Sequence, residues 1–182
     1  MNSPEKIVYL MRGLPATGKS HTAKKLAGEN GVICETDEYF HTEVGDDRKR
    51  FDYDRSLMPK ARDWNFERFE RSVTSGVTPI VVDRGNSLSI ETQRYARYAV
   101  DHGYQVEIKE PASDWWQEIR VLLKYKSLTG PVLDQWAQEL ARYSSSIHRV
   151  TPEMIRRRME KWIHGLTVAD VLNYRPKPEN RA

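Results

Sequence analysis

The sequence Gly13-Leu14-Pro15-Ala16-Thr17-Gly18-Lys19-Ser20 fits the pattern G-x-x-x-x-G-K-S without a mismatch. Gly13 and Gly18 let the backbone curl so that successive N–H groups point into one concavity, which suits an anion. Lys19 can reach the outer phosphates of a nucleotide, and the Ser20 hydroxyl can bind Mg²⁺. The pattern therefore predicts a loop that holds the phosphates of a nucleotide.

The residues on either side of this motif favour a strand before it and a helix after it. Ile7–Met11 is an apolar run typical of a strand, and His21–Ala27 favours a helix that ends at Gly28. A helix that begins near Gly18 would add the positive end of its dipole to an anion site. The alternative, a glycine-rich turn that binds no ligand, would make this context a coincidence.

The composition is that of a soluble, globular chain. Its 182 residues suffice for one domain with a core, and 38% of them are hydrophobic and 30% charged. No apolar run approaches the roughly 20 residues of a membrane helix, and the N-terminus has no signal-peptide stretch. Cys34 is the single cysteine and fits a buried strand better than a nucleophile. We therefore expect a cytoplasmic protein with no membrane partner, and the sequence leaves its oligomeric state open.

Four strand-like runs alternate with helical patterns over the first part of the chain. The runs are Ile7–Met11, Val32–Glu35, Pro79–Val82 and Gln105–Lys109. Strands that alternate with helices imply an α/β fold, with a parallel sheet and helices on both of its faces.

After Lys109 the sequence indicates helices alone. The apolar stripes there are Trp116, Ile119 and Leu123, and then Ile155, Met159, Trp162 and Leu166. Thr151 and Pro152 suit the cap and first turn of the last helix. Two charged segments read as solvated surface: the loop Asp46–Arg50, and the helix face that carries Arg156–Arg158.

Carboxylates follow two of the predicted strands. Open parallel sheets bind ligands at the carboxyl ends of their strands, and Asp37 and Asp83 come at two such ends. Phosphoryl transfer often needs a carboxylate near the acceptor proton, and Asp37 is placed for that work. Asp83 follows an apolar run, where a carboxylate near Mg²⁺ would sit. The alternatives are that Asp37 caps a helix and that Asp83 pairs with Arg84.

Arginines bracket a polar break between two of the predicted helices. Arg142 and Arg149 flank residues 143–148, and a loop between helices with arginines beside it is typical of a closing lid. Such an arginine would neutralise charge on the phosphate that is transferred.

Several stretches, in order along the chain, resemble small P-loop kinases of the polynucleotide 5′-hydroxyl kinase type, within the zeta-toxin and polynucleotide-kinase-like AAA family of ATP-binding proteins. Thr36-Asp37-Glu38-Tyr39-Phe40 is similar to the S-x-D-D-Y-F of that family. The other matching stretches are Arg12–Ser20, Phe51-Asp52, Asp63-Trp64-Asn65 with Arg68, Pro79–Asn86, Gly103-Tyr104, Glu110-Pro111, Glu139–Arg142 and His148-Arg149-Val150.

The resemblance implies a fold and an activity. The fold is a three-layer α/β/α P-loop NTPase fold with a small parallel sheet of about four strands and a helical C-terminal lid region. We expect a single kinase domain over residues 1–173, with the lid and an extension at about 112–166, and a flexible tail at 174–182. The activity is transfer of the γ-phosphate of ATP, with Mg²⁺, to a hydroxyl acceptor.

The resemblance also implies roles for individual residues. Lys19, Asp37 and Arg142 would be catalytic, with Asp37 as the general base for the acceptor hydroxyl. Ser20 and Asp83 would lie at the metal, and Asp37, Asp83 and Asn86 near the acceptor. The residues expected at ATP are Gly13, Leu14, Pro15, Ala16, Thr17, Gly18, Lys19, Ser20, Thr22, Arg142 and Arg149.

The chain departs from the family at the positions that bear on the acceptor and the lid. Arg84-Gly85 replaces N-T, Arg149 stands in place of Gly, residues 117–138 form a longer connection, and Phe40 stands where phage-type kinases carry an arginine. The acceptor is therefore left open among a nucleic acid 5′-OH end, a nucleoside and a small nucleotide-like metabolite. Two alternatives remain: a zeta-toxin-like kinase of nucleotide sugars, and a module that binds ATP without transferring phosphate.

Overall fold

A four-stranded parallel sheet forms the centre of the fold. The computed structural model describes residues 5–44, 48–144 and 150–176. The strand order is β2 (Val32–Cys34), β5 (Ile80–Asp83), β1 (Ile7–Met11) and β6 (Gln105–Lys109), with Leu10 of β1 paired to Val82 of β5. The predicted parallel sheet is confirmed. Its strands differ from the prediction by one residue at three ends, because β2 ends at Cys34, and β5 begins at Ile80 and runs on to include Asp83.

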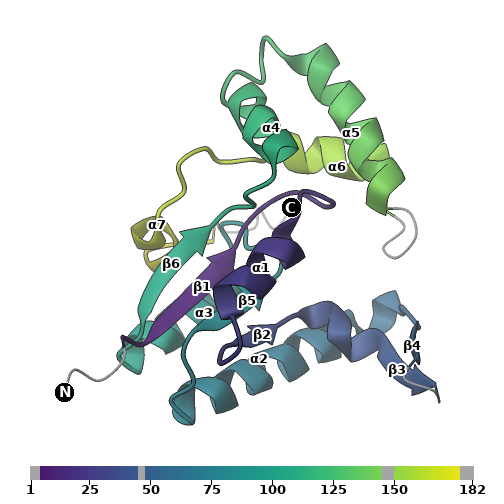
Figure 1. Cartoon of the computed structure of the whole chain (residues 1–182). Helices are drawn as coiled ribbons and strands as arrows, with labels where there is room; N and C mark the ends of the chain where they lie inside the picture. Colours follow the sequence, from purple (N-terminus) through teal and green to yellow (C-terminus); the bar gives the residue numbers. More distant parts are fainter. Residues whose placement is uncertain (1–4, 45–47, 145–149, 177–182) are drawn as a thin grey trace, which may run out of the picture.

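Helices cover both faces of this sheet, as predicted (Figure 1). α1 (Lys19–Ala27) packs on the face of Met11 and Val81, while α2 (Met58–Thr74), α3 (Ile90–Asp101) and α7 (Val168–Leu172) cover the face of Leu10 and Val82. Strands buried on both sides read as continuous apolar runs, which is why the sequence revealed them. Phe69 of α2 is fully buried, and a side chain of that size stabilises the fold by about 2–3 kcal/mol.

A separate group of helices stands at the end of the sheet to which the strand arrows point (Figure 1). It consists of α4 (Asp114–Lys124), α5 (Gly130–Ser144) and α6 (Pro152–Glu160). Trp116, Ile119, Ile155 and Met159 are all buried in its core, so the first predicted stripe and the α6 part of the second face inward. Leu14 of the glycine-rich loop belongs to the same core, which joins these helices to the loop.

The last long helix is shorter than the sequence indicated. Thr151 caps α6, as predicted, because its hydroxyl accepts a 3.3 Å hydrogen bond from the Met154 N–H. The helix ends at Glu160, so Trp162 and Leu166 follow it in irregular structure instead of extending the stripe. Further along, Tyr174 still accepts a hydrogen bond from Gln93, while residues 177–182 of the predicted tail lie outside the described residues.

A small hairpin replaces part of a predicted loop. β3 (His41–Val44) and β4 (Arg48–Phe51) pair in antiparallel fashion, so the prediction of a charged loop was wrong for residues 48–50. Asp46 and Asp47 lie outside the described residues. Two short 3₁₀ helices, η1 (Thr36–Phe40) and η2 (Arg55–Leu57), flank the hairpin. Within the described ranges, the helices are all too short or too polar to cross a membrane.

Candidate active site

The glycine-rich loop connects β1 to α1 and has the backbone that the motif requires. Gly18 is the N-cap of α1 with φ 88°, a left-handed conformation that favours glycine. A Cβ on Gly13 would stand 2.9 Å from Pro111 and from the Thr17 hydroxyl, closer than van der Waals contact allows. The loop therefore keeps its tight shape because both glycines lack side chains.

Lys19 is held inside the loop by its own backbone. Its ammonium donates a 2.7 Å hydrogen bond to the Leu14 carbonyl, which also accepts one from the Thr17 hydroxyl. Burial lowers the pKa of Lys19 to about 8, with the charges of Asp83 and Asp37 opposing that shift and Arg158 adding to it. An ammonium has three donors, so two remain for a ligand. A phosphate here would restore the charge balance that burial disturbs.

Asp83 and Ser20 form a hydroxyl–carboxylate pair beside Lys19. Asp83 is buried, and its carboxylate is hydrogen-bonded to the Ser20 hydroxyl. Burial raises the pKa of Asp83, while the Ser20 hydrogen bond and the Lys19 charge oppose the rise. Arg84 forms its ion pair with Glu91, 2.6 Å away, so the sequence alternative of an Asp83–Arg84 pair does not hold.

This pair fits a magnesium ion that arrives with a nucleotide. Mg²⁺ usually takes one or two protein oxygens and completes its shell with phosphates and water. In the described ranges no group of three or more His, Cys, Asp or Glu side chains could hold a metal without such help. Ser20 and Asp83 thus supply the small donor set that a magnesium–nucleotide complex needs.

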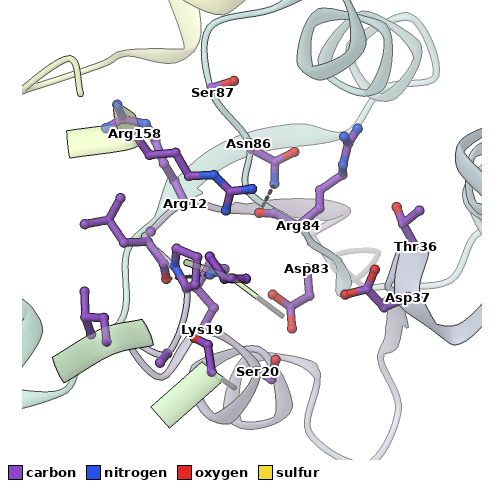
Figure 2. A pocket seen from close by; sticks show the side chains of 18 of the residues that line it. Arg12, Lys19, Ser20, Thr36, Asp37, Asp83, Arg84, Asn86, Ser87 and Arg158 are labelled. Carbon is purple, nitrogen blue, oxygen red and sulfur yellow. Dashed lines mark hydrogen bonds between the residues drawn. The ribbon is translucent and has the colours of Figure 1, made fainter. Parts of the chain in front are cut away.

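Asp37 faces Asp83 across the cavity, as Figure 2 shows. It lies inside η1, whose N-cap is Glu35, so Asp37 is not the helix cap that the sequence allowed. Glu35 lines the same cavity, and burial together with the charges of Asp83 and Asp37 raises its pKa to about 7. The sequence reasoning missed Glu35 because it was assigned to the second strand. Its position as an acidic residue where that strand ends was the available signal.

The cavity around these groups is large enough for two ligands. Its volume is about 1350 Å³. Pockets for one small molecule usually measure about 300–1,000 Å³. The glycine-rich loop lies between two walls, one from η1, α2 and the residues after β5, the other from α4, α5 and α6. A nucleotide and a second substrate can therefore occupy it together.

Asn86 links two strands of the sheet at the edge of the cavity. It is buried, and its amide nitrogen donates to the carbonyls of Met11 at 2.7 Å and Val82 at 2.9 Å, which ties β1 to β5. Its amide oxygen is buried and has no hydrogen-bond partner among the described residues. Asn86 also lies among the residues that line the cavity.

One wall of the cavity carries three linked charges that motif analysis did not single out. The Glu91 carboxylate lies 2.6 Å from Arg84 and 3.6 Å from Arg62, and all three residues line the cavity. Two guanidinium groups share one carboxylate, so this cluster has a net positive charge, while Glu35 and Asp37 add negative charge on the same side of the cavity.

The arginines are arranged differently from the sequence prediction. Arg158 lines the cavity (labelled in Figure 2), and its charge is felt by Lys19. Arg142 is exposed, forms an ion pair with Glu139 at 3.3 Å, and is not among the described residues that line the cavity. Arg149 lies outside the described residues. The solvated face expected for the triplet holds for Arg157 and Arg158, which are both exposed, whereas Arg156 is half-buried and pairs with Asp134 at 2.6 Å. Arg158 follows Ile155 by three positions, which places it beside the buried stripe.

Arg12 fixes the start of the loop through contacts with residues before α4 and after α6. It is buried, its guanidinium lies 3.6 Å from the ring centre of Trp162, and it donates a 2.8 Å hydrogen bond to the Ile163 carbonyl. Glu110 is its ionic partner at 3.5 Å. Burial lowers the pKa of Arg12 to about 10, and the Glu110 charge opposes that shift. These contacts fix the residue that precedes Gly13.

Comparisons with known proteins agree with this geometry. The family described as AAA domain matches residues 8–118, more than half of the chain. Human NEDD4-binding protein 2 is 30% identical over 169 residues, which cover 92% of this chain and 8% of that protein. Human YLP motif-containing protein 1 is 27% identical over 132 residues, 61% of this chain and 6% of that protein. The chain thus spans less than a tenth of the length of these two relatives.

Proposed function

The chain belongs to the AAA-domain family, with a P-loop NTPase fold, and from that premise we propose that it transfers the γ-phosphate of Mg-ATP to a hydroxyl acceptor. One observation carries the proposal. Asp37 faces the Ser20–Asp83 pair and Lys19 within a single cavity that has room for two ligands. A protein that only binds ATP has no use for a carboxylate placed toward an acceptor.

Each residue has a defined part in the transfer. The loop N–H groups and Lys19 hold the phosphates, and Ser20 and Asp83 hold Mg²⁺, which neutralises phosphate charge when it is bound. Asp37 orients the acceptor hydroxyl and takes its proton as the oxygen bonds to the γ-phosphorus. The bond from that phosphorus to the β-phosphate oxygen breaks, and ADP leaves. Arg158 lies where it can stabilise the charge that develops, a role that Arg142 and Arg149 are predicted to share.

The cluster of Arg62, Arg84 and Glu91 favours an acceptor that brings a negative charge to this part of the cavity. Arg62, Arg84 and Glu91 lie on the same side of the loop as Asp37. A nucleic acid 5′-OH end and a nucleotide sugar both bring phosphate groups that would pair with these arginines, whereas a nucleoside brings none. We propose the nucleic acid end first, and the nucleotide sugar as the alternative.

The organisation of the chain fits this activity. We propose that residues 1–173 form one kinase domain in which α4–α6, at 112–166, act as a lid, because their core includes Leu14 of the loop. We propose the cytoplasm as its compartment. The single cysteine, Cys34, is buried, and burial raises the pKa of its thiol to about 12. A thiol in this state is unreactive, so Cys34 gives no sign of the disulfide chemistry of an oxidising compartment.

The proposal is tested with ATP labelled at the γ-phosphate and a panel of nucleic acid ends, nucleosides and nucleotide sugars, with products identified by mass. Lys19→Ala is expected to lose ATP binding. Asp37→Asn is expected to keep ATP binding and lose transfer. Asp63→Asn is the matched control, because Asp63 is an exposed carboxylate outside the cavity. Full transfer by Asp37→Asn would remove Asp37 as the base, and ATP binding without transfer to any acceptor would favour a binding module.

A further inference from the structure

Trp115 stands against the glycine-rich loop in an unusual position for an aromatic side chain. It lies in the first turn of α4, is 43% exposed and lines the cavity. Its indole N–H donates a 3.1 Å hydrogen bond to the Ala16 carbonyl, and its ring lies 3.9 Å from where a Cβ on Gly18 would be. The indole is thus fixed beside the loop while part of its surface stays open to the cavity.

The wall that carries Trp115 is largely apolar, although Arg158 and Lys161 line the cavity from the same side. Trp136, whose indole N–H is bonded to Glu118 at 3.3 Å, lines the cavity from α5. Leu140, Val150 and Met154 line it from the same group of helices. The apolar part of this surface suits a flat, apolar group, and the phosphates are left to Lys19 and Arg158.

The geometry of phosphoryl transfer places the acceptor at one wall of the cavity and the nucleotide at the other. The attacking and leaving oxygens lie roughly in line on opposite sides of the transferred phosphorus. The acceptor lies at Asp37, so the leaving nucleotide extends to the other side of the loop, where α4, α5 and α6 stand (Figure 1). The loop residues beneath Trp115, Ala16 and Gly18, are among those whose backbone surrounds the inner phosphates.

We propose that the nucleobase of the phosphate donor stacks on the indole of Trp115, against the apolar wall completed by Trp136. This inference rests on the proposed function, and it adds the subsite that separates a nucleotide from a bare polyphosphate. Stacking of a base on an aromatic side chain contributes about a tenfold gain in affinity or more. The Ala16 hydrogen bond keeps the ring in place before the nucleotide arrives, so little side-chain freedom is lost on binding.

The test compares Mg-ATP with Mg-tripolyphosphate, which has the phosphates and no base, by calorimetry on the full chain without an acceptor. We expect the wild type to bind ATP at least about tenfold more tightly than tripolyphosphate. Trp115→Ala is expected to lose most of that difference while its tripolyphosphate affinity stays unchanged. Trp115→Phe keeps a ring without the N–H and is expected to keep most of the difference. Tyr125→Ala, an exposed aromatic at the end of α4 outside the cavity, should behave as wild type.

Three results would overturn the inference. The wild type could bind both ligands equally, Trp115→Ala could weaken both alike, or Trp115→Phe could match Trp115→Ala. The last two would mean that Trp115 only shapes the loop through Ala16. Lys19→Ala separates this failure from that of the proposed function. If Lys19→Ala weakens neither ligand, the phosphate site itself is wrong, whereas the stacking inference fails alone if Lys19→Ala weakens both and Trp115→Ala does not discriminate.

Discussion

The Asp83 carboxylate at the end of β5 is hydrogen-bonded to the Ser20 hydroxyl in the first turn of α1. The two residues are far apart in the sequence, and the sheet brings them together because β5 lies beside β1, which leads into the loop. The hydroxyl and the carboxylate would supply two oxygen ligands to a Mg²⁺ ion, and phosphates and water would supply the rest. A single substitution at Asp83 therefore tests the proposed magnesium site.

Asp83→Asn is expected to raise the Mg²⁺ concentration needed for ATP binding by about tenfold or more, the range seen when groups that orient metal ligands are removed. The reason is that the amide keeps the size of the carboxylate and loses its charge. Titration of Mg²⁺ at fixed ATP measures the change. ATP binding that depends on Mg²⁺ as in the wild type would exclude Asp83 from the metal site.

Glu35→Gln is expected to stabilise the protein more at pH 8 than at pH 5. The pKa of Glu35 is raised from 4.5 to about 7 in the folded protein, so the folded state binds its proton more tightly than the unfolded state does. The carboxyl costs little below pH 4.5, and its cost grows between pH 4.5 and pH 7 and levels off above pH 7. Between pH 5 and pH 8 the cost grows by about 2 kcal/mol, which the glutamine does not incur. Urea unfolding of both proteins at the two pH values measures this difference, and an equal difference at both would contradict it.

Arg12→Ala is expected to lower the free energy of unfolding by about 3 kcal/mol. The change removes the ion pair of Arg12 with Glu110, which is left with Arg120 at 3.7 Å and the Trp116 indole N–H, and it removes the guanidinium that covers Trp162. Arg12→Lys keeps the charge and loses the planar group, so its free energy of unfolding should lie between those of Arg12→Ala and the wild type. Urea unfolding at neutral pH measures all three proteins. Equal stability of Arg12→Lys and the wild type would mean that charge alone is needed.

Arg158→Ala is expected to lower kcat for transfer about a hundredfold or more, the size of effect found when one preorganised donor is removed from a transition state. Its neighbour Arg157 is exposed and does not line the cavity, so Arg157→Ala is the matched control. Loss of the Arg158 charge should also raise the pKa of Lys19, since that charge now lowers it. Equal kcat values for the two variants would remove Arg158 from the mechanism.

Arg142→Ala separates the sequence prediction from the geometry. The resemblance makes Arg142 a lid arginine, whereas its side chain is exposed and paired with Glu139 in this structure. A fall in kcat as large as that of Arg158→Ala would show that α5 brings Arg142 to the phosphates during the reaction. A fall of less than about threefold would assign the work to Arg158.

What the sequence revealed was local, and what it missed depends on tertiary structure. The loop, the four strands and the capped start of α6 depend on residues close together in the chain, so motif and periodicity were sufficient. Arg158 could not be told from Arg157, because only the packing of α6 decides which of them faces the cavity. Glu35 differs from a strand residue only by lying where β2 has ended. The β3–β4 hairpin has charged residues in place of an alternating apolar pattern, so no strand signal was present.

Arg12 has a consequence for how the helical region can move. The chain leaves the sheet for α4 through Glu110 and returns from α6 through Ile163, and Arg12 holds both points at once. The side chain of Arg12, the residue before Gly13, therefore holds both connections. A rotation of α4–α6 would thus turn about Arg12 and would strain the backbone of the glycine-rich loop. The lid movement that we propose for this region would therefore also change the shape of the phosphate site.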